Sequence, residues 1–131
     1  MNPSDDLEYQ LDTLAIRTGH TRSFEGEHGE PIFLTSSFVY ENAAEAAAKF
    51  SGQVQGNIYS RFTNPTVSMF EKRLAALDGA ERAVATSSGM GAILSIAMAY
   101  LKAGDHVICS RAVFGSIVAL FEKYIAKFGV D

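Results

Sequence analysis

The second half of the sequence follows the order strand, helix, strand, helix. RAVAT (82–86) and HVICS (106–110) are short apolar runs typical of strands, and a segment with helical periodicity follows each of them. Strands that alternate with helices predict a parallel α/β sheet. A third strand is expected to begin at Val130-Asp131. Because two parallel strands leave open edges and an unfinished core, we expect this chain to be the truncated front part of a larger α/β domain.

Glycines and one capping residue predict where the helices of this half begin and end. Asn64 suits a helix cap, and Pro65 fits the first turn that follows it. Three helices are predicted, each ending before a glycine: residues 65–78 before Gly79, residues 90–103 before Gly104 and residues 116–128 before Gly129. We therefore expect residues 64–131 to form the start of an incomplete α/β domain.

Residues 1–63 have a different pattern. Ser4 suits the cap of a first, amphipathic helix. Residues 20–41 mix glycine, proline and serine with apolar runs that lack a helical period, which predicts an extended arm. Asn42 and Glu45 have the spacing of a capping box before an alanine-rich helix. This part is predicted to be an N-terminal helix and an arm that makes contacts between subunits.

Composition excludes several classes of protein. The formal charge of −4 comes from scattered acidic and basic residues, so no basic block indicates nucleic-acid binding. The single cysteine, Cys109, forms no internal disulfide, which suits a reducing cytosol. No apolar run approaches the ~18 residues of a membrane span, and the acidic N-terminus lacks an apolar signal region. We expect a soluble, cytoplasmic protein that binds neither membranes nor nucleic acids.

The segment TSSGMGAI (86–93) lies between a predicted strand and a predicted helix. Free N–H groups and a partial positive charge at a helix N-terminus favour phosphate. Gly89 and Gly91 would let the backbone approach an anion closely, and Ser87 or Ser88 could add a hydroxyl. Because position 94 holds no glycine, the motif is not the dinucleotide fingerprint GxGxxG. A tight turn with a serine cap is the alternative interpretation.

Two aromatic positions are further candidates. Tyr59 and Arg61 lie two apart in a predicted loop, where a guanidinium fork and a phenol could hold a phosphate. The alternative is a solvated arginine beside a packing tyrosine. Phe114 follows the second predicted strand, at the end of a parallel sheet where ligands bind, and could stack on a planar ring. The alternative is a core phenylalanine near a helix start.

Other reactive side chains lack a supporting pattern. His20, His28 and His106 do not have metal-ligand spacing, so we expect no metal site. Cys109 is expected to be a small buried strand residue rather than a nucleophile. Ser88 has no histidine and acid in a recognisable arrangement.

Together, YSRFTNPT (59–66), TSSGMGAI (86–93) and AVFGS (112–116) resemble the Cys/Met-metabolism family of pyridoxal phosphate enzymes. The stretch EHGEPIFLTSSFVYENAAEAA (27–47) and Phe114 are most similar to family members that replace the succinate of O-succinylhomoserine with sulfide. The resemblance covers nearly the whole chain. It implies an aspartate-aminotransferase-like domain of fold type I, a homotetrameric enzyme of trans-sulfuration and a homocysteine product used in methionine biosynthesis.

The resemblance also implies roles for individual residues. The family's YSR motif holds the cofactor phosphate from the neighbouring subunit, which would be the role of Tyr59 and Arg61. Its SGM turn donates N–H groups to the same phosphate, which implies Gly89 and Met90, with Ser88 close by. Most members place a tyrosine over the cofactor ring. Phe114 stands there in this chain, which keeps the stacking but loses the hydroxyl, so a lyase activity is less attractive.

In this family the Schiff-base lysine and the acid beside the pyridine nitrogen lie in the middle section of the enzyme. This chain resembles only the section before it. The lysines of the predicted helices and their ends are expected to be solvated: Lys49, Lys72, Lys102, Lys123 and Lys127. We therefore expect this chain alone to be catalytically inactive. The alternatives are a cystathionine γ-synthase, an O-acetylhomoserine sulfhydrylase, or a non-catalytic fragment that docks onto partner protomers.

Overall fold

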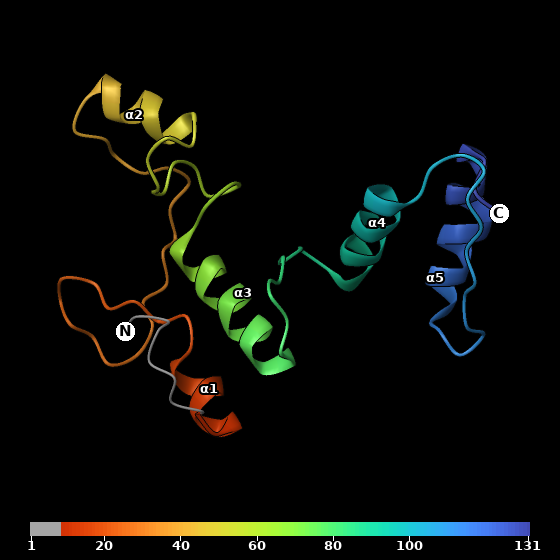
Figure 1. The fold of residues 1–131 in the computed structure, drawn as a ribbon, viewed down its shortest axis with the longest axis horizontal. Coiled ribbons are helices and arrows are strands. Elements are labelled where there is room, and N and C mark those ends of the chain that lie inside the picture. Colours follow the sequence, from red (N-terminus) through yellow and green to blue (C-terminus); the bar gives the residue numbers. More distant parts are fainter. Residues whose placement is uncertain (1–8) are drawn as a thin grey trace. The chain divides into compact units, whose positions relative to one another are not determined.

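A computed structural model describes residues 9–131, which divide into two compact units at Ala85 and Thr86 (Figure 1). The first unit holds helices α1 (Leu11–Arg17), α2 (Ala43–Phe50) and α3 (Pro65–Asp78). The second holds α4 (Gly89–Tyr100) and α5 (Gly115–Ala119), followed by a π-helical turn η1 (Leu120–Tyr124) and a 3-10 turn η2 (Ile125–Phe128). The predicted domain boundary at residue 63 stays a prediction. Within the described part of the chain, no helix is long and apolar enough to cross a membrane.

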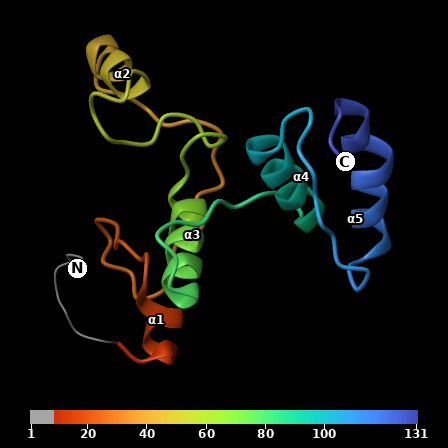
Figure 2. The ribbon, with the colours of Figure 1, turned by 45° about the vertical axis from the view of Figure 1, so that its right-hand side comes forward.

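Helix α1 packs on α3, and both views of the ribbon show the two helices side by side (Figure 2). Gly19, with φ +80°, follows α1, and a Cβ there would lie 2.7 Å from the carbonyl oxygen of Met69. Arg73 of α3 donates to the carbonyl of Thr18 at 3.0 Å and pairs with Glu30. The predicted cap at Ser4 lies outside the described residues. Helix α1 itself begins at Leu11 without a side-chain cap.

Residues 20–41 form the predicted extended arm, with no helix and a single isolated bridge between Ser37 and Tyr59. Several of its large apolar side chains face solvent, among them Phe24, Leu34 and Val39. The arm is nevertheless anchored, because the N–H of Phe33 donates to Thr66 Oγ1 at 3.0 Å. The arm is therefore held against the first turn of α3.

Asparagine caps begin both α2 and α3, as predicted. Asn42 Oδ1 accepts from the N–H of Glu45 at 2.8 Å, while the Glu45 carboxylate accepts from the N–H of Glu41 at 2.6 Å. Helix α3 has the predicted bounds, because Asn64 caps it and Gly79 closes it in the left-handed conformation with φ 64°. Local side-chain chemistry accounts for these ends.

Neither of the two predicted strands, 82–86 and 106–110, forms as a strand among the described residues. Residues 82–86 pair with no other strand among the residues described, and the N–H of Ala85 donates instead to Glu71 Oε1 at 2.7 Å. Residues near 106 find a different partner: Val107 N–H donates to the Asp131 carbonyl at 2.6 Å, and Asp131 N–H donates to the Asp105 carbonyl at 2.9 Å. These slanted bonds have the pattern of a parallel rung. Residues 105–107, at the start of the second predicted strand, are thus hydrogen-bonded to Asp131.

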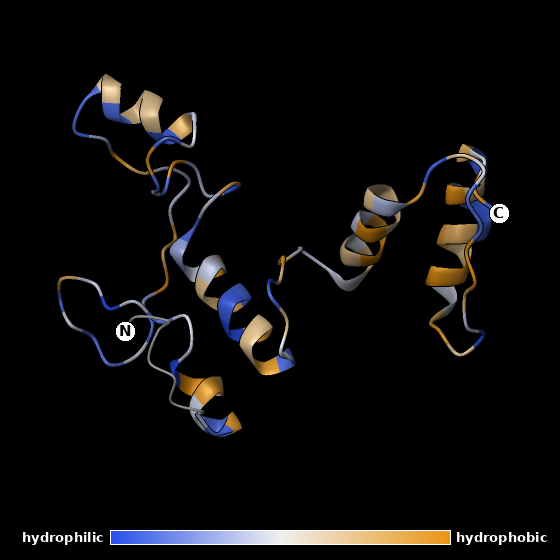
Figure 3. Ribbon diagram, viewed as in Figure 1, coloured by the Kyte–Doolittle hydropathy of each residue, from blue (hydrophilic) through white to orange (hydrophobic). Residues whose placement is uncertain are grey.

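Helical bounds in the second unit also differ from the prediction. Helix α4 ends at Tyr100, three residues earlier than predicted, because Leu101 is extended. The predicted helix 116–128 forms as three successive types of turn, and Figure 3 shows hydrophobic residues running along it. The core of the second unit consists of buried Ala97 from α4, Ile125 and Val130. Apolar burial against α4 therefore holds this segment.

Cys109 is exposed, so the prediction that it is buried is wrong. It lines a cavity of about 380 Å³ together with Val107, Phe121 and Ile125. No strand among the described residues runs beside residues 108–111, which leaves the cysteine uncovered.

We predict that Asn64→Ala lowers the free energy of unfolding by about 2 kcal/mol, because it removes a helix cap and two further hydrogen bonds made by a buried amide. Asn64 is 7% exposed, and its Nδ2 donates to the Phe33 carbonyl at 3.1 Å and to Ser60 Oγ at 3.0 Å. Urea denaturation followed by circular dichroism measures the loss. Asn42→Ala, at an exposed cap, is the matched control and should cost about 1 kcal/mol or less. Equal losses would contradict the anchoring role of Asn64.

Candidate functional site

The first turn of α4 has two unused hydrogen-bond donors. Ser88 caps the helix: its Oγ accepts from the N–H of Gly91 at 3.0 Å, and its carbonyl accepts from Ala92 at 3.0 Å. Thr86 Oγ1 also donates to the Ser88 carbonyl, at 2.8 Å. No hydrogen bond within the described residues uses the N–H of Gly89 or Met90. These two donors, at the positive end of a helix of 12 residues, suit an anion.

The two glycines of this turn differ in what they need. A Cβ on Gly91 would lie 3.2 Å from Ser88 Oγ and crowd the cap. A Cβ on Gly89 would meet no atom of the chain within 4 Å, and its φ is not positive. The fold therefore gives no reason for glycine at position 89. The open space at its Cβ position leaves room for an anion to approach the backbone, so the turn has the features that a phosphate group requires.

The structure brings the loop at Phe114 to this turn. Phe114 precedes the first residue of α5 and is 79% exposed, so it is not a core residue and its ring is free to stack. Two residues later, the hydroxyl of Ser116 donates to Met90 Sδ at 3.4 Å. Three of the predicted positions, Ser88, Gly89 and Met90, thus adjoin the segment that carries the fourth. Sequence reasoning missed Ser116, although a hydroxyl in the first turn of a predicted helix was visible.

Tyr59 and Arg61 lie together in the first unit. The guanidinium of Arg61 lies 5.4 Å from the ring centre of Tyr59 and 5.1 Å from that of Phe62. Within the described part of the chain no carboxylate pairs with Arg61, so its charge is available to an anion. Ser60 between them holds the turn, because its N–H donates to the Ser36 carbonyl at 2.9 Å and its hydroxyl to the Thr35 carbonyl.

The lysines lie where they were predicted, within helices or just beyond a helix end. Lys49 of α2 pairs with Glu45 at 2.6 Å, and Lys127 of η2 lies 5.4 Å from the ring centre of Tyr124. The others lie in α3, after α4 and in η1: Lys72, Lys102 and Lys123. None of the five belongs to the α4 turn or to the Phe114 loop. Their positions give no candidate for a covalent bond to the cofactor there.

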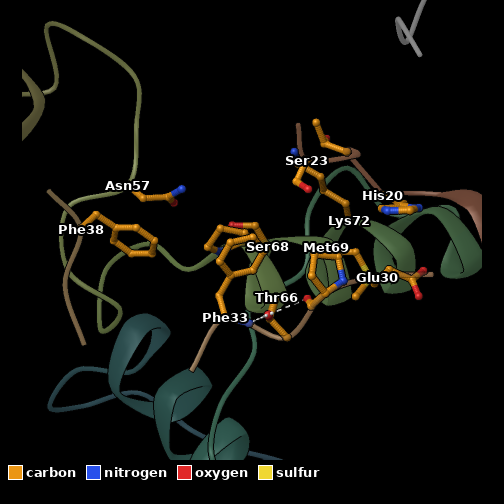
Figure 4. Close-up of a pocket in the computed structure, with 14 residues that line it drawn as sticks. His20, Ser23, Glu30, Phe33, Phe38, Asn57, Thr66, Ser68, Met69 and Lys72 are labelled. Atoms are coloured by element: carbon orange, nitrogen blue, oxygen red, sulfur yellow. Dashed lines mark hydrogen bonds between the residues drawn. The ribbon is translucent and has the colours of Figure 1, made fainter. Parts of the chain in front are cut away.

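A separate cavity of about 470 Å³ lies between the arm and α3 (Figure 4). Figure 4 shows Lys72, Ser23 and His20 toward one end and Phe38 and Asn57 toward the other. Neither Tyr59 nor Arg61 lines it. Nothing in the sequence pattern had indicated this cavity.

Hydrogen bonds between Ser23 and Glu27 hold the loop that forms one wall of this cavity. Glu27 accepts from the N–H of Ser23 at 2.7 Å and from its hydroxyl at 2.5 Å. These bonds lower the pKa of Glu27 to about 2. His20 Nε2 is buried, 3.6 Å from Glu27 Oε1, and makes no hydrogen bond. The described residues hold no cluster of histidine, cysteine, aspartate and glutamate that could bind a metal.

The model of the Cys/Met metabolism PLP-dependent enzyme family matches residues 12–131. The chain belongs to this family. It is 60% identical over 127 residues to the O-succinylhomoserine sulfhydrylase of Pseudomonas aeruginosa, covering 96% of this chain and 32% of that protein. The O-succinylhomoserine sulfhydrylase of Mycobacterium tuberculosis is 42% identical over 91% of this chain and 29% of its own length. An L-methionine gamma-lyase of Fusobacterium nucleatum is 40% identical over 95% of this chain and 31% of its own length.

Solved structures show the same fold. An O-acetylhomoserine (thiol)-lyase of Campylobacter jejuni, with N'-pyridoxyl-lysine-5'-monophosphate at its position 205, matches with a TM-score of 0.85 and 30% identity. The metB protein of Corynebacterium glutamicum matches with a TM-score of 0.83 and 28% identity. Each match covers 94% of this chain and 30% of the other. The chain thus spans about a third of the length of its relatives.

We predict that Gly89→Ala weakens the binding of inorganic phosphate about tenfold or more, equivalent to losing one hydrogen bond to a charged group. The added methyl fills the space beside the free N–H, while the fold has no atom there to clash with. Amide NMR shifts of residues 89 and 90, titrated with phosphate, measure the affinity.

The helix content of Gly89→Ala should equal or exceed that of the parent, because alanine favours a helix. Gly91→Ala is the comparison. Its Cβ would crowd the Ser88 cap, so this variant should lose helix content in addition to phosphate affinity. Unchanged phosphate affinity in Gly89→Ala would contradict the assignment of this turn.

Proposed function

We propose that this chain is the phosphate-binding N-terminal portion of a pyridoxal phosphate-dependent O-succinylhomoserine sulfhydrylase. The observation that carries the proposal is the 60% identity to the Pseudomonas aeruginosa enzyme across 96% of this chain. The L-methionine gamma-lyase of Fusobacterium nucleatum, at 40%, is a more distant relative. Membership of the family and the free donors of α4 support the same interpretation.

The reaction would be a replacement at Cγ of O-succinylhomoserine. Succinate leaves with the electron pair of the Cγ–O bond, and sulfide forms the new C–S bond of homocysteine. Pyridoxal phosphate, when bound, supplies the electron sink that makes the Cα and Cβ protons acidic. The residues of this chain bind and orient that group rather than transfer protons themselves.

Two parts of the chain would hold the cofactor. The N–H groups of Gly89 and Met90 would donate to its phosphate beside the Ser88 cap, and the exposed ring of Phe114 would pack on its ring. Tyr59 and Arg61 would reach the phosphate of the neighbouring subunit, in a homotetramer that is a dimer of dimers. The support for this grip is the uncompensated charge of Arg61 on a turn fixed by Ser60.

Phe114 bears on the type of reaction. A phenyl ring can stack on the cofactor, but it carries no group that accepts or donates a proton. A site with phenylalanine there lacks the proton carrier that tyrosine provides, which favours replacement over elimination. We also infer that the rung between Asp131 and residues 105–107 belongs to the parallel sheet of a fold type I domain.

The reactive lysine would come from beyond the matched third. In the Campylobacter jejuni structure the pyridoxyl-lysine lies at position 205, and this chain covers 30% of that protein. No lysine of this chain lies in the α4 turn or the Phe114 loop. We therefore propose that these 131 residues alone do not catalyse the reaction.

A second candidate is supported by the solved structures. The Campylobacter jejuni neighbour is an O-acetylhomoserine (thiol)-lyase, which leaves the acyl group of the substrate open. Both candidates use the same cofactor site, so the acyl group and the sulfur donor must be tested by assay. The following experiment separates them.

We predict that a chimera of residues 1–131 with the remaining part of the Pseudomonas aeruginosa relative forms homocysteine from sulfide, faster with O-succinylhomoserine than with O-acetylhomoserine. Thiol-specific chromatography of the product measures the rates. Equal or faster turnover with cysteine as the sulfur donor would contradict the sulfhydrylase function.

The 131-residue chain alone should form no product with added cofactor. A unique, stoichiometric lysine adduct after borohydride reduction would contradict the absence of the Schiff-base lysine.

We predict that Arg61→Ala in this chimera weakens cofactor retention about tenfold or more, because a charge-assisted pair to phosphate is lost. The free energy of unfolding should change by less than about 0.5 kcal/mol, since Arg61 is an exposed side chain. Equilibrium dialysis of the cofactor provides the measurement. Arg82→Ala, at another exposed arginine, is the control. Equal retention in the two variants would contradict the phosphate role of Arg61.

A further inference from the structure

One side-chain contact links the first turn of α4 to the first turn of α5. The hydroxyl of Ser116 donates to Met90 Sδ at 3.4 Å. A thioether is a weak acceptor, and a serine hydroxyl can rotate to meet it. Ser116 is the second residue of α5, and Met90 is the second residue of α4. The contact therefore joins two helix starts that lie 26 residues apart in the sequence.

The position of this contact gives it a consequence for ligand binding. Met90 supplies one of the two free N–H groups of the phosphate-binding turn. Phe114, whose exposed ring would stack on the cofactor, lies two residues before Ser116. The contact thus ties the group that would hold the phosphate end to the segment that would hold the ring end.

No second hydrogen bond within the described chain joins these two segments, residues 86–92 and 111–119. The apolar cluster that packs α4 against the C-terminal segment includes Ala97, Ile125 and Val130. Ala97 lies about two turns along α4 from Met90. The cluster holds the far part of α4, and the Ser116–Met90 contact is the hydrogen bond that joins its first turn to the Phe114 segment among the described residues.

We propose that Ser116 is a positioning residue that sets the spacing between the α4 phosphate turn and the Phe114 ring. This inference rests on the proposed function, because it assumes that one ligand spans both. Ser116 acts through Met90 and does not itself need to touch the ligand. A phosphate group alone needs only the turn, whereas a pyridoxyl phosphate needs the turn and the ring at a set spacing.

The test compares two ligands on the 131-residue chain by amide NMR titration. Inorganic phosphate probes the turn, and pyridoxine 5'-phosphate probes the turn and the ring. The latter has no aldehyde, so it forms no Schiff base with lysine. We expect Ser116→Ala to weaken pyridoxine 5'-phosphate binding about two- to fivefold, the size of one weak hydrogen bond, and to leave phosphate binding unchanged. Ser116→Thr, which keeps the hydroxyl, should restore the affinity.

A double-mutant cycle tests whether Ser116 acts through the sulfur. Met90→Leu removes the acceptor but keeps the backbone N–H and a similar volume. We expect Met90→Leu to weaken pyridoxine 5'-phosphate binding as Ser116→Ala does, and Ser116→Ala to add nothing in the Met90→Leu background. Additive losses would overturn the proposal.

The titrations distinguish a failure of the Ser116 role from a failure of the proposed phosphate turn. If phosphate shifts neither amide 89 nor amide 90 in the parent chain, the proposed phosphate turn fails, and the inference fails with it. If both ligands shift these amides and Ser116→Ala binds pyridoxine 5'-phosphate as tightly as the parent, the inference alone is overturned. An equal loss for both ligands would also overturn it, because Ser116 would then shape only the turn.

Discussion

The buried amide of Asn64 ties the first unit together. Its Oδ1 accepts from the N–H of Thr66 at 2.9 Å to begin α3, while its Nδ2 reaches the arm at Phe33 and the loop at Ser60. Ser60 lies between Tyr59 and Arg61, so the side chain that begins the helix also holds the turn that carries these two residues. A helix cap is a local device, but a buried amide with two donors can serve three segments at once. The geometry of Tyr59 and Arg61 therefore depends on how α3 begins.

In the second unit, Ser88 caps α4 and so determines which N–H groups of the first turn stay free. An uncapped helix presents more free N–H groups than a phosphate can use, and water would compete for them. The Ser88 hydroxyl accepts a hydrogen bond from the N–H of Gly91, and no hydrogen bond among residues 9–131 uses the N–H groups of Gly89 and Met90. The cap thus selects which donors remain. Glycine at position 91 makes room for the cap, and glycine at position 89 leaves room beyond the chain.

The predictable features are those decided within a few residues. Asn64 and Gly79 mark both ends of α3, because a cap and a left-handed glycine act locally. Residues 82–86 and 106–110 were predicted as strands but pair with no other strand among the described residues, because strand pairing depends on distant segments, here Asp131 for residues 105–107. The six predicted site positions rest on motif resemblance, and their roles stay predictions. Ser116 was missed: its hydroxyl was visible in the sequence, but a hydroxyl–thioether contact across 26 residues leaves no spacing pattern.

Charge gives a reason for dividing a phosphate grip between subunits. A phosphate monoester carries a charge of about −1.5 to −2 at neutral pH, whereas a helix N-terminus contributes only about +0.5. The α4 turn alone would therefore leave most of the charge unbalanced, and in the proposed assembly the guanidinium of Arg61 would add the missing cation. Under the proposed assembly that cation arrives only with the neighbouring subunit. Cofactor binding and subunit association would then be thermodynamically linked, because each stabilises the state that the other requires.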